Sequence, residues 1–190
     1  MTPGFAAEVI AAVCVEAKAF ARVTASEEDA LFARLAESAL GLAEAFLRVS
    51  LIVRAHRAVL PAAAVWQVLP VGPVTEISTV EGLPADGAAF ALPVGSYAID
   101  VDAGGDGWVR VTAPGSAGRV AVTYAAGLAS DWAGVPGPVA QGVVRLTGHL
   151  YATRDGMGPV PAAVTALWRP FRRIDLMGRE RGRERGWGRC

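Results

Sequence analysis

Residues 119–127 read RVAVTYAAG and residues 138–155 read PVAQGVVRLTGHLYATRD, and these two segments decide the fold. In the first segment, Val120, Val122 and Tyr124 alternate with smaller or polar residues. This period of two predicts a strand with one buried face. The strand should end at the glycine that closes the segment.

The second segment has the pattern of an amphipathic helix. Pro138 suits the first turn, because the N–H that proline lacks has no partner there. The apolar residues that follow are spaced so that they share one face: Val139, Val143, Leu146 and Leu150. Neither segment carries a catalytic motif.

Two more helices are predicted before this point, over residues 6–22 and 26–48. The apolar face of the first contains Val9, Val13, Ala17 and Phe20, with Ile10 and Cys14 beside it. The apolar face of the second is predicted to contain Leu31, Leu35, Leu42 and Phe46. The two helices are expected to form a hairpin.

Between the helices, residues 65–126 have the pattern of a β region. About six short apolar runs are separated by Pro, Gly and Asp: VWQVL, VTEISTV, AAFAL, YAIDVD, WVRVT and RVAVTYA. Helices are then expected at 138–154 and 162–168. The predicted fold class is α+β, with antiparallel helices and a β-rich insertion between an N-terminal helix pair and the C-terminal helices.

The length of the chain and its charge distribution indicate one domain followed by a short basic tail. A chain of 190 residues is long enough for one domain with a core of its own. The domain is predicted over residues 1–177. Residues 178–190 are predicted to form an Arg- and Gly-rich C-terminal tail. Residues 169–190 hold eight Arg against three acidic residues, a local charge of +5. Because the whole chain has zero net charge, the remaining residues carry −5, and a basic tail on an acidic body suggests a specific partner for the tail.

Cysteine usage and hydropathy indicate the cellular compartment in which the chain is made. Cys14 and Cys190 provide no disulfide framework, which fits synthesis in a reducing bacterial cytoplasm. The N-terminal apolar run has no basic segment before it, so a signal peptide is not expected. No uncharged apolar stretch reaches the length of a membrane span, so no membrane association is expected.

The residues that could carry chemistry are few and scattered. His56 and His149 lie in no metal-binding motif, and a zinc site needs about four ligands. Asp100, Asp102 and Asp106 lack the glutamate that completes a calcium-binding loop, so they predict a turn at a strand end. The glycine-rich turns lack the Gly-Lys-Ser/Thr ending of a phosphate loop. We therefore expect no catalytic residue, no metal site and no cofactor, and the chain is not expected to be an enzyme.

Several short motifs occur in an order that resembles a known family. A strand ending V-x-Y-x-A-G, then V-P, then a helix ending L-Y-x-x-R-D are formed by Val122, Tyr124, Ala126, Gly127, Val135, Pro136, Leu150, Tyr151, Arg154 and Asp155. Gly72-Pro73-Val74, the strand Gly95-Ser96-Tyr97-Ala98-Ile99-Asp100 and the closing Trp168-Arg169-Pro170-Phe171-Arg172 extend the pattern. Over about residues 18–176 the chain resembles the head–tail connector (adaptor) proteins of long-tailed phages and of gene transfer agents. The family often has T-G-R-x-[LI] after the long helix, where this chain reads LRVSLI at 47–52.

The resemblance implies a structural role in a particle. The domain predicted over residues 1–177 would be a head–tail connector domain. An adaptor of this family forms a ring, a dodecamer, under the portal protein at the head–tail interface of a virion or gene transfer agent. It extends the DNA channel and provides the attachment site for a stopper or other tail-side connector protein. DNA would pass through the lumen without specific binding, and an acidic body would favour sliding because like charges repel.

The resemblance also suggests which residues meet the portal, since connector C-termini commonly reach into the portal ring. The candidates are Trp168, Arg169, Phe171, Arg172, Arg173, Arg179, Arg181, Arg183, Arg185 and Trp187. The alternative is a nucleic-acid-binding module that uses the Arg-rich C-terminal tail, because clustered guanidinium groups attract phosphate. Two glutamates interrupt that cluster and dilute its charge.

Overall fold

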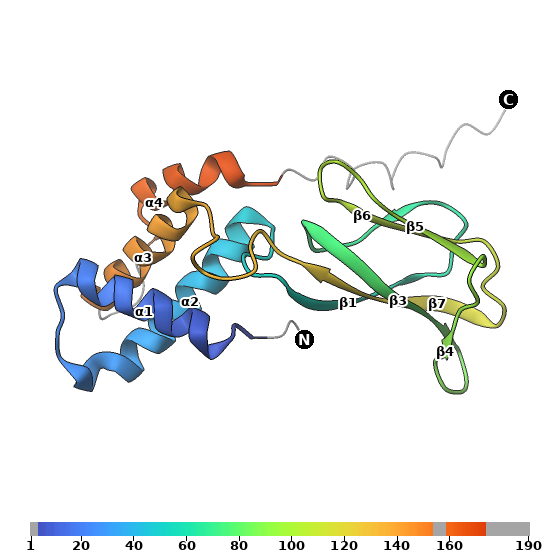
Figure 1. Cartoon of the computed structure of the whole chain (residues 1–190), viewed down its shortest axis with the longest axis horizontal. Coiled ribbons are helices and arrows are strands. Elements are labelled where there is room, and N and C mark those ends of the chain that lie inside the picture. Colours follow the sequence, from blue (N-terminus) through green and yellow to red (C-terminus); the bar gives the residue numbers. More distant parts are fainter. Residues whose placement is uncertain (1–3, 154–158, 174–190) are drawn as a thin grey trace, which may run out of the picture.

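The computed structural model describes residues 4–153 and 159–173. The chain forms a helical half and a β half that lie end to end along the long axis (Figure 1). The helical half contains α1 (Ala7–Ala21), the 3₁₀ turn η1 (Ser26–Glu28), α2 (Asp29–Leu47), α3 (Gly137–Ala152), α4 (Ala162–Trp168) and the 3₁₀ turn η2 (Arg169–Phe171). All strands lie between α2 and α3, so the predicted α+β arrangement is confirmed.

The helical half has a core built on small residues. On α3 the predicted face is confirmed: Val139 and Val143 are fully buried and Leu146 nearly so. On α2 the prediction was wrong, because the buried face is the neighbouring one: Phe32, Ala36, Ala39, Leu40, Ala43 and Leu47. Alanines let a neighbouring helix approach closely, and a pattern read from the large leucines alone misses them. Leu42, predicted to be buried, is 43% exposed.

On α1 most of the predicted face is correct. Val9, Val13 and Ala17 are buried against the other helices. Phe20 is 55% exposed, although it lies on the predicted face. Its ring lies over Gly148 of α3, where a Cβ atom would come within 2.9 Å of the ring. Phe20 therefore packs at the edge of the core, where the helix ends and solvent reaches one side of the ring.

The β half is a sandwich of two antiparallel sheets. One sheet has the order β1-β7-β3-β4 and the other β2-β6-β5. The strands are β1 (Arg54–Pro61), β2 (Gln67–Val68), β3 (Val74–Pro84), β4 (Phe90–Ala91), β5 (Tyr97–Val101), β6 (Gly107–Val111) and β7 (Ala117–Ala126). Residues of both sheets share one core, which includes Val80, Val120 and Val122 from the first sheet and Val109 and Val111 from the second.

The strand predicted from RVAVTYAAG is the central element of the larger sheet. β7 pairs with β1 on one side and β3 on the other. Val120, Val122 and Tyr124 are buried, as their alternation predicts. The strand ends where the backbones of two segments meet: a Cβ atom on Gly127 would lie 2.3 Å from the backbone nitrogen of Val53. Only glycine fits this close approach.

The predicted β region, 65–126, starts too late. β1 begins at Arg54 and forms an edge of the larger sheet, with Arg54 opposite Ala126 and Pro61 opposite Arg119. Its two buried residues are His56 and Ala58, while Val59 is 48% exposed. A strand whose inward residues are polar or small gives no apolar alternation, so the sequence pattern does not reveal it.

Candidate functional site

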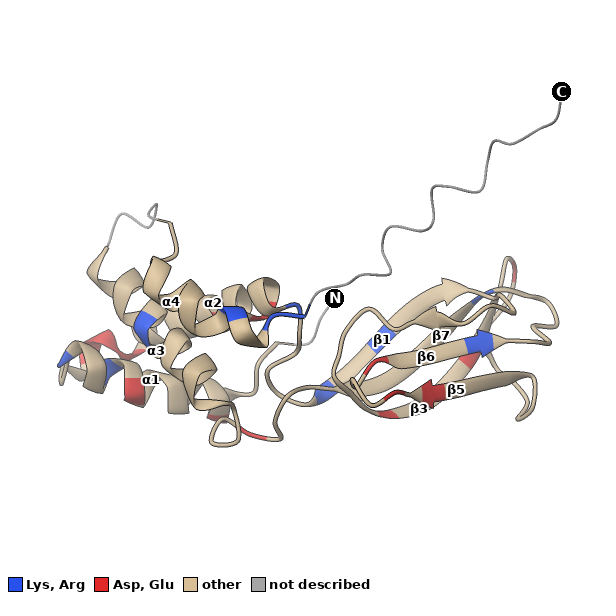
Figure 2. Cartoon of the chain, turned by 90° about the horizontal axis from the view of Figure 1, so that it is seen from above, with Lys and Arg blue, Asp and Glu red and all other residues tan. Residues whose placement is uncertain are grey.

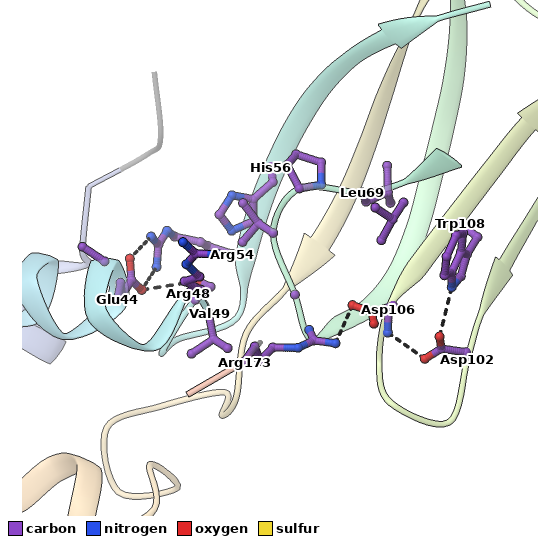
Figure 3. A pocket seen from close by; sticks show the side chains of 16 residues that line it. Glu44, Arg48, Val49, Arg54, His56, Leu69, Asp102, Asp106, Trp108 and Arg173 are labelled. Atoms are coloured by element: carbon purple, nitrogen blue, oxygen red, sulfur yellow. Dashed lines mark hydrogen bonds and ion pairs between the residues drawn. The ribbon is translucent and has the colours of Figure 1, made fainter. Parts of the chain in front are cut away.

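An open groove of about 720 Å³ lies where the helical half meets the β half. The end of α2 contributes Glu44 and Arg48, β1 contributes Arg54 and His56, and the turn between β5 and β6 contributes Asp102 and Asp106. Figure 3 shows these side chains with Arg173, which enters from the C-terminal end of the described chain. The groove is thus lined by charged groups of both signs.

The first ion pair at the groove connects α2 to β1. The two terminal guanidinium nitrogens of Arg54, Nη1 and Nη2, donate to the carboxylate of Glu44, at 2.7 and 2.6 Å. The backbone N–H of Leu51 donates to the same carboxylate at 2.8 Å. The two side chains are only 13% and 16% exposed, and the Phe5 ring lies against the guanidinium, 5.0 Å from centroid to carbon. This cluster fixes the end of α2 to the start of the β half.

Arg173 forms a second connection between the halves. Its backbone N–H donates to the carbonyl of Leu47, at the end of α2, at 2.9 Å. Its guanidinium donates to the carbonyl of Gly104 at 3.0 Å and to the carboxylate of Asp106. The side chain crosses Gly72, where a Cβ atom would lie 2.0 Å from the guanidinium. A side chain at residue 72 would therefore displace Arg173.

The aspartates of the β5–β6 turn have structural partners. Asp102 accepts the backbone N–H groups of Gly104 and Asp106 at 2.8 and 2.9 Å, and the indole N–H of Trp108 at 3.0 Å. The Trp108 indole and then the backbone donors hold the pKa of Asp102 below its ordinary value. This arrangement is the turn that the sequence predicts, with the carboxylate used to shape the backbone.

His56 lies at the inner edge of the groove. It is 6% exposed, and its ring stacks on Tyr124 with centroids 5.7 Å apart. Burial lowers the pKa of His56, and the nearby Arg54 lowers it further, whereas Glu44 acts in the opposite direction. Its packing identifies His56 as a core residue of the β half, and the neutral ring is the favoured form.

The lowered pKa of His56 makes stability depend on pH. In the unfolded chain the pKa returns to about 6.5, so below that pH the unfolded state binds more protons than the folded state. We therefore expect the free energy of unfolding to be constant above pH 6.5, as far as His56 determines it, and to fall as the pH drops below 6.5. Urea denaturation at pH 7.5 and 5.5 measures this, and His56→Gln should lose less stability on acidification. Equal losses in both proteins would contradict the assignment to His56.

The described residues do not include a group of three or more His, Cys, Asp or Glu side chains that could hold a metal ion. Within the same part of the chain, no helix is long and apolar enough to cross a membrane. Around the groove, Arg54 pairs with Glu44 and Arg173 with Asp106, and these two ion pairs connect the two halves of the chain.

Comparisons with known proteins give structural matches alone. No family model and no curated protein matches the sequence. One match is a chain in the solved neck of an empty gene transfer agent particle, computed with C6 symmetry. It is 24% identical to this chain and aligns with a TM-score of 0.74. The alignment covers 94% of this chain and 98% of the neck chain. The chain has the fold of a gene transfer agent neck protein.

Two further structures support the same match. A chain of the virion of a native gene transfer agent particle aligns with a TM-score of 0.67 and 25% identity. A chain of the neck of a native particle, computed with C12 symmetry, aligns with a TM-score of 0.70 and 24% identity. Each alignment covers 94% of this chain and 98% of the other. The family resemblance read from the sequence motifs is confirmed by this neck-protein fold.

Within this neck-protein fold, the predicted portal-contact residues separate into two groups. Trp168 is fully buried. Its indole N–H donates to the carbonyl of Val139 at 3.1 Å, and its ring lies 5.7 Å from that of Phe46. We correct the prediction for this residue, because a side chain without exposed surface supports α4 and cannot touch a partner. The prediction rested on the family resemblance of the closing motif Trp168-Arg169-Pro170-Phe171-Arg172, and a motif does not specify whether a residue is buried.

The remaining candidates lie at or beyond the end of the described chain. Arg169 is exposed, and Arg172 lies over the Phe46 ring at 5.5 Å. Phe171 packs partly against the helical core, and Arg173 is held at the groove. The other candidates lie outside the described residues: Arg179, Arg181, Arg183, Arg185 and Trp187.

Proposed function

We propose that this chain is a structural head–tail adaptor. It forms a ring under the portal of a virion or gene transfer agent particle, extends the DNA channel and provides the attachment site for a stopper or other tail-side protein. The observation that supports this most strongly is the end-to-end match to neck chains, which spans 94% of this chain and leaves almost no part of the neighbour unmatched. The match therefore involves both halves and their connection.

The symmetry of the matching necks supports a ring. Two of the necks were computed with C6 and C12 symmetry. A closed ring of identical chains needs two different surfaces that complement each other, since each copy meets its neighbours head to tail. A ring of twelve fits both symmetries, because a twelve-fold ring also has six-fold symmetry. The acidic body, with −5 outside residues 169–190, would repel DNA from the lumen wall.

The end of the described chain is the proposed approach to the portal. Arg169, Phe171 and Arg172 form its last helical turn and the residue that follows. Arg173 ties this turn to the β half through Gly104 and Asp106. The last described residue is thus held in place, which would favour docking of this end of the described chain into a neighbouring protein.

The alternative, a nucleic-acid-binding module, has less support in the described residues. Four of the basic side chains there are paired with carboxylates: Lys18 with Asp29, Arg54 with Glu44, Arg57 with Glu81, and Arg173 with Asp106. Basic side chains that already have acidic partners contribute little to phosphate binding. The alternative depends on the tail, and it predicts a salt-dependent shift of duplex DNA by the purified chain.

Deletion of the gene in a strain that produces the particles tests the proposal. We expect filled heads without tails, seen by electron microscopy, because the attachment site would be missing. Expression of the full chain from a plasmid should restore tailed particles. Normal particles without the chain, or a cryo-EM map that places it away from the neck, would refute the adaptor function.

A further inference from the structure

Three connecting segments meet at the end of the β half that lies farthest from the helices (Figure 1). Strands β1, β3 and β6 run toward this end, and β2, β5 and β7 start from it. The segments are residues 61–66, 85–96 and 112–116, which include the last residue of β1 and the short strand β4. They are joined by backbone hydrogen bonds, from Val111 to Ala63 at 2.8 Å and from Thr112 to Ser96 at 2.8 Å. We call these residues the distal surface.

The distal surface is almost without charge. It reads PAAAVW, ADGAAFALPVGS and TAPGS, and Asp86 is its one charged residue, in a chain with 19% charged residues. In Figure 2 most of the ribbon at this end of the β half is tan, and coloured charged residues lie on the adjoining strands. Large apolar side chains project from it: Val94 is 98% exposed, Val65 68% and Trp66 42%. Arg110, over the Trp66 ring at 4.8 Å, lies at its rim. An apolar centre with a polar rim is the anatomy of a protein interface.

Val94 is held out by a rigid turn. The backbone N–H and the hydroxyl of Ser96 both donate to the carbonyl of Pro93, at 3.0 and 2.6 Å. Gly95 has a φ of 96°, which a residue with a side chain rarely adopts. The carbonyl of Ser96 accepts the N–H groups of Thr112 and Ala113, at 2.8 and 3.0 Å. Because the turn is already ordered, binding through Val94 has a small entropic cost.

The lack of charge on this surface indicates a protein partner and not a nucleic acid. None of its three segments contains Lys or Arg, and the nearest basic residues, Arg110 over the Trp66 ring and Arg119 opposite Pro61, lie on the adjoining strands. The surface itself has no group that neutralises phosphate, so DNA is a poor ligand for it.

The proposed portal-contact residues Arg169, Phe171 and Arg172 belong to the helical half. These residues precede Arg173, which bonds Leu47 and Asp106 where the two halves meet, whereas the distal surface lies at the far end of the β half (Figure 1). The two sites are therefore separate and differ in chemistry, as a protein between two different neighbours requires.

We infer that the distal surface docks the tail-side connector protein through an uncharged, apolar patch of that partner, with Val94 inserted at the centre. This inference rests on the proposed adaptor function and adds the surface and the kind of contact. A carboxylate placed at residue 94 would then be buried without a partner, which strongly opposes docking.

Complementation of the deletion strain tests the inference. We expect Val94→Asp to leave the chain on the heads, detected by mass spectrometry of purified particles, and to lower the fraction of tailed particles at least about ten-fold. Val65→Asp, on the neighbouring segment, should act in the same direction. Val94→Leu, which keeps the apolar contact, should retain tails. Val15→Asp is the matched control, since Val15 is 70% exposed on α1 in the helical half.

The outcomes separate the two proposals. Tailed particles at the normal level with Val94→Asp and Val65→Asp would overturn the inference and leave the adaptor function intact. Heads that lack the variant chain would also overturn it, because the distal surface would then meet the portal or other copies of the chain. Normal particles in the deletion strain itself would instead refute the adaptor function.

Discussion

Trp168→Ala should lower the free energy of unfolding by about 3–5 kcal/mol. The indole is fully buried and lies between α3 and the Phe46 ring of α2. Its N–H bonds the carbonyl of Val139 at 3.1 Å, and a Cβ atom on Gly142 would lie 2.1 Å from the same nitrogen. The substitution leaves a cavity that neighbouring helices cannot fill and an unbonded carbonyl. For a chain of this size the melting temperature should fall by roughly 6 to 20 °C, as measured by circular dichroism.

Trp66→Ala is the matched control, because it removes the same side chain from a site that is 42% exposed. Its main contact to be lost is Arg110 over the ring, a cation–π interaction of about 0.5–1 kcal/mol at exposed sites. We expect a much smaller loss of stability than for Trp168→Ala. Similar losses in the two variants would show that Trp168 is not the core residue described here, and would return it to the candidates for partner contact.

The sequence predicts those elements whose buried residues are large and regularly spaced. β7 and α3 were found from Val120, Val122, Val139 and Val143, all of which are buried. The buried face of α2 was missed because three of its members, Ala36, Ala39 and Ala43, are alanines. β1 was missed because its buried residues are His56 and Ala58. Small or polar residues become core residues through what packs against them, and a single sequence does not contain that information.

The candidate site was harder to predict than the fold. Glu44, Arg54, Asp106 and Arg173 are far apart in sequence and have no shared spacing, so the ion pairs that brace the two halves become visible only in three dimensions. A glutamate in the last turn of a helix, followed ten residues later by an arginine that starts a strand, was the one available signal for the first pair. The misassignment of Trp168 has the same origin, because a motif specifies residue types and leaves burial undetermined.

Glu44→Ala should cost up to about 3 kcal/mol, because removing one partner from a fully buried ion pair costs about 3–5 kcal/mol and this pair is partly buried. The change leaves Arg54 without its carboxylate in a site where its side chain is only 13% exposed. It also leaves the N–H of Leu51 without its acceptor. Because the pair joins α2 to β1, we expect the junction to loosen first, with faster hydrogen exchange at Leu51 and Val53 than in the wild-type chain.

Two control variants test whether the lost stability comes from the charge of Glu44 and from its partly buried position. Glu44→Gln keeps an oxygen that can accept from Leu51 and removes the charge, so it should lose less stability than Glu44→Ala. Glu81→Gln breaks the exposed pair with Arg57, whose side chains are 52% and 39% exposed, and should change stability by about 0–1 kcal/mol. If Glu44→Ala lost as little stability as Glu81→Gln in urea denaturation, the Glu44–Arg54 pair would not brace the junction. The relative placement of the two halves would then depend on Arg173 and on the backbone hydrogen bond from Val53 to Ala129.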